Sequence, residues 1–322
     1  MKQPPQAPGP MVGLALEVRC VPGGTLVYCR QDSVEPININ CHYRDTNMDL
    51  PDKDTLATLI LRQARELGAD LVGLTNVRAL KKEPSPQVVP FIPAGTYGSM
   101  ENVYGLRPGE VRWPRGGRSV IVVALAHPED RPELDWWYWL MDPPGNRTLK
   151  NIVQSLKEWL ADNYGLESTH ISYHIEKGGI FLKEAARLAG LGCIGRNNLL
   201  ITPQFGPRVR LRALILNTEL PSTGPSSFDP CLKCPAPCQK NCPSLAFDKI
   251  VLTKEMTGVS LLPGRDGRYH RENCAQIMQL NEDEAQLELA PEISAEPIPI
   301  IKYCRNCEVF CPVGSQAGAG AG

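Results

Sequence analysis

The chain has 322 residues, of which 42% are hydrophobic, and a formal net charge of −1. This length suits one large domain or two modest ones with a real hydrophobic core. No apolar stretch approaches the roughly 18 residues of a membrane-spanning helix, so no membrane contact is expected. Residues 1–10 are Pro-rich and lack the pattern of a targeting segment. With its many reduced cysteines, the chain is predicted to be cytoplasmic.

The elements are predicted in chain order from the spacing of apolar residues. Residues 1–50 are predicted to be an N-terminal extension that contains a hairpin around Pro22-Gly23-Gly24. A helix follows over 54–67, with Asp52 or Asp54 as its N-cap and Gly68 as its end. Further strands are predicted at 70–77, 119–126, 168–175 and 209–217, and further helices from Leu149 to Gly165 and over 179–189. Strands that alternate with helices predict a layered α/β core over 51–220.

Composition marks the rest of the chain. The segment 221–230 is rich in Pro, Ser and Gly and is predicted to be the linker that opens a second domain over 221–315. The stretch 281–296 is acidic and is predicted to be a solvated insertion. The Ala-Gly repeat within 316–322 predicts a disordered tail.

Eight of the twelve cysteines lie in the last third of the chain, in two linked runs. The first run reads Cys231-x2-Cys234-x3-Cys238-x3-Cys242-Pro243, and the second reads Cys304-x2-Cys307-x3-Cys311-Pro312, with Cys274 ahead of it. A Cys-Pro at the end of such a run is a ferredoxin signature. Zinc more often uses two well-separated Cys pairs, and disulfide frameworks belong to secreted chains. The runs therefore predict two [4Fe–4S] clusters and one-electron chemistry.

The cysteine before each proline is predicted to serve the other cluster, as in two-cluster ferredoxins. Cluster one then takes Cys231, Cys234, Cys238 and Cys311, and cluster two takes Cys242, Cys274, Cys304 and Cys307. The gap 235–237 has three residues where the usual run has two, so the position of Cys238 is the least secure. With both clusters the net charge falls to roughly −5. This charge argues against a general nucleic-acid binder, and nucleic acid is not expected as a partner, although Arg208, Arg210 and Arg212 could form a local basic stripe.

A glycine-rich loop follows the helix predicted over 179–189, and its sequence is Gly190-Leu191-Gly192-Cys193-Ile194-Gly195-Arg196-Asn197. Such glycines let backbone amides approach a ligand closely. The alternative is a helix C-cap followed by tight turns. The spacing matches neither a dinucleotide-binding nor a P-loop pattern, so a nucleotide is not supported.

The block over 189–210, followed by the two cysteine runs, resembles epoxyqueuosine reductases and reductive dehalogenases. The resemblance rests on Ala189–Asn197, on Arg196–Arg210 and on the strand segment Arg118–Ala124. It implies a nitroreductase-like α/β core that holds a corrinoid, cobalamin, against the nearer cluster, followed by a two-cluster ferredoxin-like domain. The implied corrinoid contacts are Gly190, Leu191, Gly192, Cys193, Gly195, Arg196, Asn197 and Gly206.

The chain departs from the resemblance at two places that bear on catalysis. Epoxyqueuosine reductases have tryptophan where this chain has Cys193, which is either a small buried residue or one that faces the corrinoid. Their Arg-Asp-Tyr-His proton-donor motif has no clean match in residues 127–135. Tyr138, Asp135 and His127 are the candidate catalytic residues, since an acid group must lie near the substrate. The alternatives are a hydrophobic anchor for the aromatic segment and a structural role for the histidine.

These features predict an iron–sulfur oxidoreductase. An external donor of the ferredoxin or flavodoxin type would supply electrons, two clusters would carry them, and a corrinoid would reduce a small-molecule substrate. The alternative is an electron-transfer or activating protein that reduces the corrinoid of a partner protein and binds no cofactor besides its clusters.

Overall fold

The computed structural model describes residues 50–92, 105–138, 141–291 and 293–314. From Leu50 onward the chain forms one compact unit. The predicted N-terminal hairpin and the Ala-Gly tail lie outside the described residues. The division of the compact unit into a core over 51–220 and a cluster domain over 221–315 stays a prediction.

A four-stranded antiparallel sheet forms the core, with the strand order β1-β2-β7-β4. The bounds are Leu71–Asn76 for β1, Ser119–Ala126 for β2, Val209–Leu216 for β7 and Ser168–His170 for β4. Seven of the eight residues of β2 are buried, because helices cover both of its faces, and this explains its unbroken apolar run. Strand β4 is shorter than predicted, since the chain leaves the sheet after His170 and forms the 3-10 turn η4, Ile175–Lys177.

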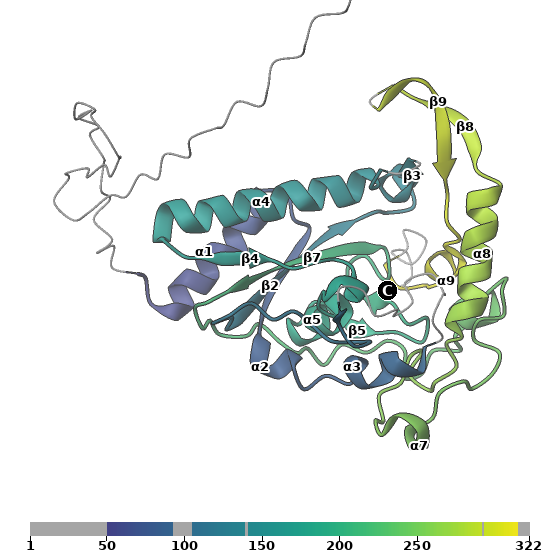
Figure 1. Ribbon diagram of the computed structural model, residues 1–322, viewed down its shortest axis with the longest axis horizontal. Coiled ribbons are helices and arrows are strands. Elements are labelled where there is room, and N and C mark those ends of the chain that lie inside the picture. The colour runs from purple at the N-terminus through teal and green to yellow at the C-terminus, as the bar shows by residue number, and fades with distance from the viewer. Residues whose placement is uncertain (1–49, 93–104, 139–140, 292, 315–322) are drawn as a thin grey trace, which may run out of the picture. The chain divides into compact units, whose positions relative to one another are not determined.

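Helices cover both faces of this sheet (Figure 1). Helices α1 (Lys53–Glu66) and α4 (Pro144–Tyr164) pack on one face, and α2 (Val77–Leu80) and α5 (Leu182–Leu188) pack on the other. The predicted cap of α1 is confirmed, because the Asp52 side chain accepts hydrogen bonds from the N–H groups of its first turn. The predicted end of α4 is confirmed as well, since Gly165 adopts the left-handed conformation with φ of 62°.

Alternate residues of β2 divide the core into two halves. Ile121 and Val123 pack against α1 and α4, and Val120 and Val122 pack against α5. The result is a three-layer arrangement of helices, sheet and helices, as the sequence predicts. The nitroreductase-like character of this core stays a prediction.

The cysteine-rich segment follows as short elements around the end of the core. They are α6 (Pro237–Lys240), α7 (Lys254–Thr257), α8 (Arg271–Asp283), β8 (Gln286–Ala290), β9 (Ser294–Ile301) and α9 (Asn306–Val309). The acidic stretch 281–296 is not a simple insertion: it ends α8 and contributes to the β8–β9 hairpin. Strand β9 also pairs with β3 (Trp137–Tyr138), because Ile300 and Ile301 lie opposite those aromatic residues.

The remaining short elements connect these layers. They are α3 (Ser85–Val88), η1 (Val89–Phe91), η3 (Pro132–Asp135), β5 (Cys193–Ile194) and β6 (Leu200–Ile201). Within the ranges that the structure describes, no helix combines the length and the apolar character needed to cross a bilayer.

Glu184 is a buried carboxyl in α5, with 2% of its surface exposed. Its Oε1 accepts hydrogen bonds from the backbone N and the Oγ of Ser85, and its Oε2 has no partner among the described residues. Burial raises the pKa of Glu184 to about 7. In the unfolded chain the pKa of this group is near its ordinary value. Between that pH and about 7 the folded state therefore binds more protons than the unfolded state. Stability therefore falls as the pH rises towards 7.

We expect Glu184→Gln to remove this pH dependence. The variant should be more stable than the wild type by about 1–3 kcal/mol at pH 8.5, and the difference should shrink towards pH 5. Thermal unfolding of both proteins at the two pH values checks this. A difference that is the same at both pH values would contradict it.

Candidate metal and redox site

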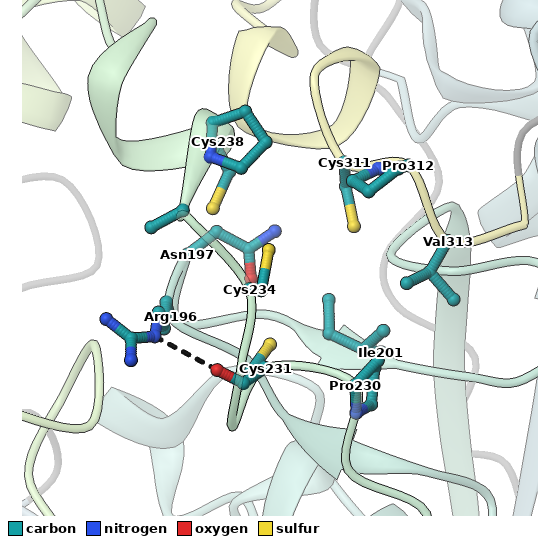
Figure 2. Close-up of a pocket in the computed structure, with 12 residues that line it drawn as sticks. Arg196, Asn197, Ile201, Pro230, Cys231, Cys234, Cys238, Cys311, Pro312 and Val313 are labelled. Atoms are coloured by element: carbon teal, nitrogen blue, oxygen red, sulfur yellow. Dashed lines mark hydrogen bonds between the residues drawn. The ribbon is translucent and has the colours of Figure 1, made fainter.

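Four cysteines from two distant segments converge on one pocket at the end of the core. Cys231, Cys234 and Cys238 come from the first run, and Cys311 comes from the second. Their sulfur atoms point towards a common space, with Pro312 beside Cys311 (Figure 2). This is the set that crossed ligation predicts for cluster one.

The extra residue in the first run is accommodated by a local backbone change. Ala236 adopts the left-handed conformation with φ of 57° and caps the short helix α6. This conformation is costly for a residue with a Cβ, and it lets the chain turn so that Cys238 lies in the pocket with the other three cysteines. The left-handed conformation of Ala236 therefore explains how Cys238 reaches the pocket despite the three-residue gap before it.

The other four cysteines also lie near one another. Cys304 and Cys307 lie within electrostatic range of each other, and both lie within range of Cys242 and Cys274. Burial raises the pKa of the Cys307 thiol well above its usual range, and the charge of Glu308 and the neighbouring thiols raise it further. Thiols packed in this way need a bound cation before they ionise together. The grouping matches the set predicted for cluster two.

Among the described residues, no three His, Cys, Asp or Glu side chains are placed to share a single metal ion. A four-iron cube holds its thiolates further apart than one zinc ion does.

The glycine-rich loop packs against protein on the faces that a ligand would need. A Cβ on Gly190 would lie 2.9 Å from the carbonyl oxygen of Thr223, and one on Gly206 would lie 1.9 Å from that of Val313. At Gly192 the corresponding distance, to the carbonyl oxygen of Ile201, is 2.0 Å. These glycines permit backbone-to-backbone packing. The corrinoid contacts of the loop stay a prediction.

We expect Gly192→Ala to destabilise the fold by about 3 kcal/mol or more, because the new methyl group would overlap a backbone carbonyl. Gly165→Ala is the matched control, since it has a positive φ but nothing within 4 Å of the added Cβ. That control should cost only about 1 kcal/mol. Thermal unfolding of the two variants measures the difference, and equal costs would show that the close approach at Gly192 relaxes freely.

The rest of the loop divides between the core and the cysteine pocket. Leu191 packs in the core beneath the sheet, and Gly195 lies against the side chain of Ile201. Arg196 and Asn197 line the pocket of the four cysteines, where Arg196 Nε donates to the carbonyl oxygen of Cys231 at 3.2 Å.

Asn197 connects the two cysteine groups. Its side chain lines the first pocket, and its Nδ2 donates to the carbonyl oxygen of Cys307 at 3.0 Å. The side chain is 3% exposed, so this hydrogen bond is shielded from water. The corrinoid contacts of Arg196 and Asn197 stay a prediction, and both residues are placed to support the cysteines.

Cys193 is buried, as the first of its two interpretations expects, and lies behind Cys231. Its Sγ donates to Asp229 Oδ1 at 3.8 Å, and the neighbouring Cys193 thiol lowers the pKa of Cys231 to about 6. The interaction with Cys231 and burial raise the pKa of Cys193. Cys231 is thus favoured as the thiolate of the pair, which is the form that binds metal.

Arg208, which directly precedes β7, and Arg210 and Arg212 of β7 form a row that runs from the cysteine pocket along the sheet. Arg208 is 1% exposed and donates to the carbonyl oxygens of Val313 at 3.0 Å and Cys311 at 3.3 Å. Arg210 is paired with Asp135, and Arg212 stacks over the ring of Tyr173 at 4.2 Å. The stripe is therefore buried and bonded to protein, so it is no exposed basic surface.

Two of the three candidate catalytic residues share a partner. Arg305, from the second cysteine run, contacts His127 Nδ1 through Nη2 at 2.7 Å, and its Nε lies 3.8 Å from Asp135 Oδ2. Burial lowers the pKa of His127 to about 4, so it is neutral, and its backbone carbonyl oxygen accepts from Arg305 Nη2 at 3.1 Å. These are the contacts of a structural histidine.

Tyr138 lies apart from this pair. It is 4% exposed and packs with Ala290 and Ile300 from the β8–β9 hairpin, and Arg147 lies over its ring. This surrounding fits the hydrophobic anchor that the sequence offered as the alternative. Whether any of the three residues is catalytic remains a prediction.

A cavity of about 440 Å³ opens between α4 and β7, at the Arg212 end of the arginine row. Its charged and polar lining includes Asp142, Lys150, Gln154, His170, Tyr173, His174 and Arg212. Arg212 is 7% exposed, and the hydrogen bond described for its guanidinium goes to the carbonyl oxygen of Leu211. Sequence reasoning missed this site, although the alternate spacing of the arginines at 208, 210 and 212 was a signal for it.

No family model matches the chain. It is 29% identical over 191 residues to an epoxyqueuosine reductase of Gloeobacter violaceus. This match covers 56% of this chain and 59% of the relative. It is 24% identical over 285 residues to the epoxyqueuosine reductase of Pseudomonas aeruginosa, covering 83% of this chain and 71% of the relative. The match thus spans less than two thirds of the first of these relatives.

Solved structures of two families share the fold. One is an epoxyqueuosine reductase bound to a modified tRNA stem loop, with a TM-score of 0.52, 18% identity and coverage of 81% of this chain and 65% of that one. The other is the catabolic reductive dehalogenase NpRdhA in complex with 3-bromo-4-hydroxybenzoic acid. Its TM-score is 0.54 at 18% identity, and the match covers 84% of this chain and 34% of that one. These relatives and neighbours support the superfamily that the sequence motifs suggested, that of epoxyqueuosine reductases and reductive dehalogenases.

Proposed function

We propose that the protein is an iron–sulfur oxidoreductase that carries electrons through two [4Fe–4S] clusters to a ligand bound beside the core. The observation that carries this proposal is the grouping of eight cysteines into two sets of four, each drawn from both runs. Four thiolates per set are the ligands that a [4Fe–4S] cluster takes. The relatives named as reductases agree with an oxidoreductase.

Each residue group has a separate task in this proposal. The eight cysteines hold the clusters. Asn197, through its bond to Cys307, fixes the separation of the two sites. Arg208 ties the segment that carries Cys311 to β7, so that the first site stays against the core. Electrons that reach cluster one are then beside the arginine row that leads to the cavity at Arg212.

The cavity offers a place for the group that is reduced. A volume of about 440 Å³ lies in the range of small-ligand sites. Arg212 favours a ligand with an anionic group, because a buried guanidinium pairs well with a carboxylate or phosphate. Lys150, which also lines the cavity, is already paired with Asp142. The external donor is expected to be of the ferredoxin or flavodoxin type, and the cytoplasmic location stays a prediction.

A corrinoid is the cofactor that the sequence resemblance implies, and one solved neighbour is described as a B12-dependent dehalogenase. The residues predicted to touch it do not form an open cradle, since Gly190, Gly192 and Gly206 are closed by backbone atoms. A corrin ring with its side chains is also larger than the cavity at Arg212. We therefore derive no catalytic step through a corrinoid.

The closed glycine loop favours a second candidate function. In it the protein binds no cofactor besides its clusters and reduces the corrinoid of a partner protein. Nucleic acid also returns as a candidate partner, because one solved neighbour has a tRNA stem loop bound. The buried arginine row cannot provide the basic surface for such a contact.

Anaerobic reconstitution with iron, sulfide and cobalamin, followed by gel filtration, tests these candidates. The main proposal expects about eight iron atoms per chain and reoxidation of the reduced clusters by an added small-molecule acceptor. Retained cobalt would establish the corrinoid. Reoxidation only by a corrinoid protein would favour the second candidate, and a chain without iron would refute both.

A further inference from the structure

Four large apolar side chains of the two cysteine runs are exposed to solvent. Each lies within three residues of a predicted cluster ligand, and between 44% and 72% of its surface is exposed: Leu232, Leu245, Val309 and Phe310. A single exposed apolar residue is ordinary on a protein surface. Several of them gathered beside redox centres are typical of a contact surface for another protein.

The two runs meet at the surface of the molecule. Helix α6 of the first run packs against α9 of the second (Figure 2). Beside this contact, Asn306 Nδ2 donates to the carbonyl oxygen of Asn241 at 3.4 Å. Leu245 lies one turn from Asn241, because its backbone N donates to the carbonyl oxygen of Cys242 at 3.2 Å. Val309 is the last residue of α9, so exposed apolar residues of both runs lie around one pair of helices.

Leu232 and Phe310 extend this surface towards the first pocket. Leu232 directly follows Cys231, and Phe310 directly precedes Cys311. Both of these cysteines line the pocket of the four cysteines. The exposed apolar residues thus adjoin the predicted ligands of both clusters.

Leu245 is exposed at a cost to the backbone. It adopts the left-handed conformation with φ of 53°, which is unfavourable for a residue with a bulky side chain. Its side chain gains little burial in return. Asparagine or glycine would adopt this conformation more readily. An unfavourable conformation that brings no gain in packing points to a functional constraint, here on an exposed apolar side chain.

The exposed charges of the two runs are positive. Lys233 and Lys240 are the charged residues of the segment 231–247, and both are exposed. Neither forms an ion pair or side-chain hydrogen bond with a described residue. The charged residue of the segment 306–314 is Glu308, which is 15% exposed and paired with an arginine. The two lysines therefore offset the negative charge of the clusters towards an approaching acidic protein.

We propose that these four apolar residues, with Lys233 and Lys240 beside them, are the docking surface for the external electron donor, a small acidic protein whose redox group lies at its own apolar surface. The apolar residues would exclude water between the two redox groups, and the lysines would steer the donor. Transient redox complexes use small surfaces, under about 1,200 Å² in total. In the complex one electron leaves the donor and reduces one cluster, and no bond is made or broken. The proposal rests on the clusters of the proposed function.

Stopped-flow reduction of the anaerobic holoprotein by a reduced, acidic flavodoxin tests the role of the lysines, with cluster absorption as the readout. Lys233→Glu combined with Lys240→Glu should lower the second-order rate constant about tenfold or more at low ionic strength. The difference should nearly vanish at about 1 M salt, where the screening length is about 3 Å. Lys53→Glu combined with Lys82→Glu is the matched control and should keep the wild-type rate constant, since both lysines are exposed and lie outside the cysteine runs.

Leu245→Asn tests the apolar part of the surface. Its melting temperature should equal or exceed that of the wild type, because asparagine tolerates the left-handed conformation. Its rate constant with flavodoxin should fall about threefold to tenfold, as expected for one lost apolar contact. Dithionite is a small reductant that needs no docking, so it should reduce every variant at the wild-type rate.

Two results would overturn the inference. One is a double variant of Lys233 and Lys240 that flavodoxin reduces as fast as the wild type at low ionic strength. The other is a variant whose reduction by dithionite slows as much as its reduction by flavodoxin. Failure of dithionite to reduce any cluster in the reconstituted wild type would instead refute the proposed function.

Discussion

Replacing Cys311 with serine should remove about four iron atoms per chain and leave about four, although this residue ends the second cysteine run. The reason is that Cys311 lies in the pocket of Cys231, Cys234 and Cys238. Three thiolates do not hold a four-iron cluster as firmly as four, and the cysteine ligands are largely buried. Iron and sulfide analysis after anaerobic purification measures the loss.

Double variants show which cluster each cysteine serves. With crossed ligation, Cys311→Ser combined with Cys231→Ser should lose no more iron than either change alone. Combined with Cys304→Ser, it should lose nearly all iron. The opposite pattern would mean that each run holds its own cluster. Cys193→Ser is the matched control and should keep about eight iron atoms, because Cys193 does not line the pocket.

Asp135→Asn should destabilise the protein by about 3 kcal/mol, because it removes the partner of the largely buried Arg210 and one of the two carboxyl groups near Arg305. Asp135 is paired with Arg210, and its Oδ2 lies 3.8 Å from Arg305 Nε. The three side chains are only 12–16% exposed, so water compensates poorly for the lost charge. Thermal unfolding under anaerobic conditions measures the change.

The matched control for this prediction is Asp266→Asn. Asp266 pairs with Arg268, and the two side chains are 43% and 39% exposed, so the loss should stay within about 0.5 kcal/mol. Arg305 lies between Cys304 and Cys307 in sequence, so Asp135→Asn should also loosen cluster two, and iron content reports this. Equal melting temperatures for the two variants would contradict the prediction.

The periodic elements of the core could be predicted from sequence because the physical signal is local. The apolar run of β2 and the capping residues of α1 and α4 are read from neighbouring residues. Strand β4 was predicted too long, because the chain leaves the sheet after His170 and forms the turn η4. Pairing of β9 with β3 depends on residues more than 150 positions apart and leaves no local pattern.

The same distinction applies to the site. The cysteine sets were predictable because the spacing of the ligands can be seen directly in the sequence. The supporting contacts of Asn197 and Arg208 were not, since each residue hydrogen-bonds to a carbonyl oxygen more than 100 positions away. The glycine loop shows the limit of a motif: the same glycines that would admit a ligand also admit a neighbouring backbone, and only the packing around Gly192 distinguishes the two.

Native mass spectrometry of the anaerobically purified chain tests the central claim most directly. Two clusters predict a mass excess equal to about eight iron and eight sulfide atoms per chain. In Cys311→Ser this excess should be smaller by about four iron and four sulfide atoms, the content of one cluster. A mass excess equal to one or two zinc ions, or none at all after reconstitution with iron and sulfide, would contradict the account.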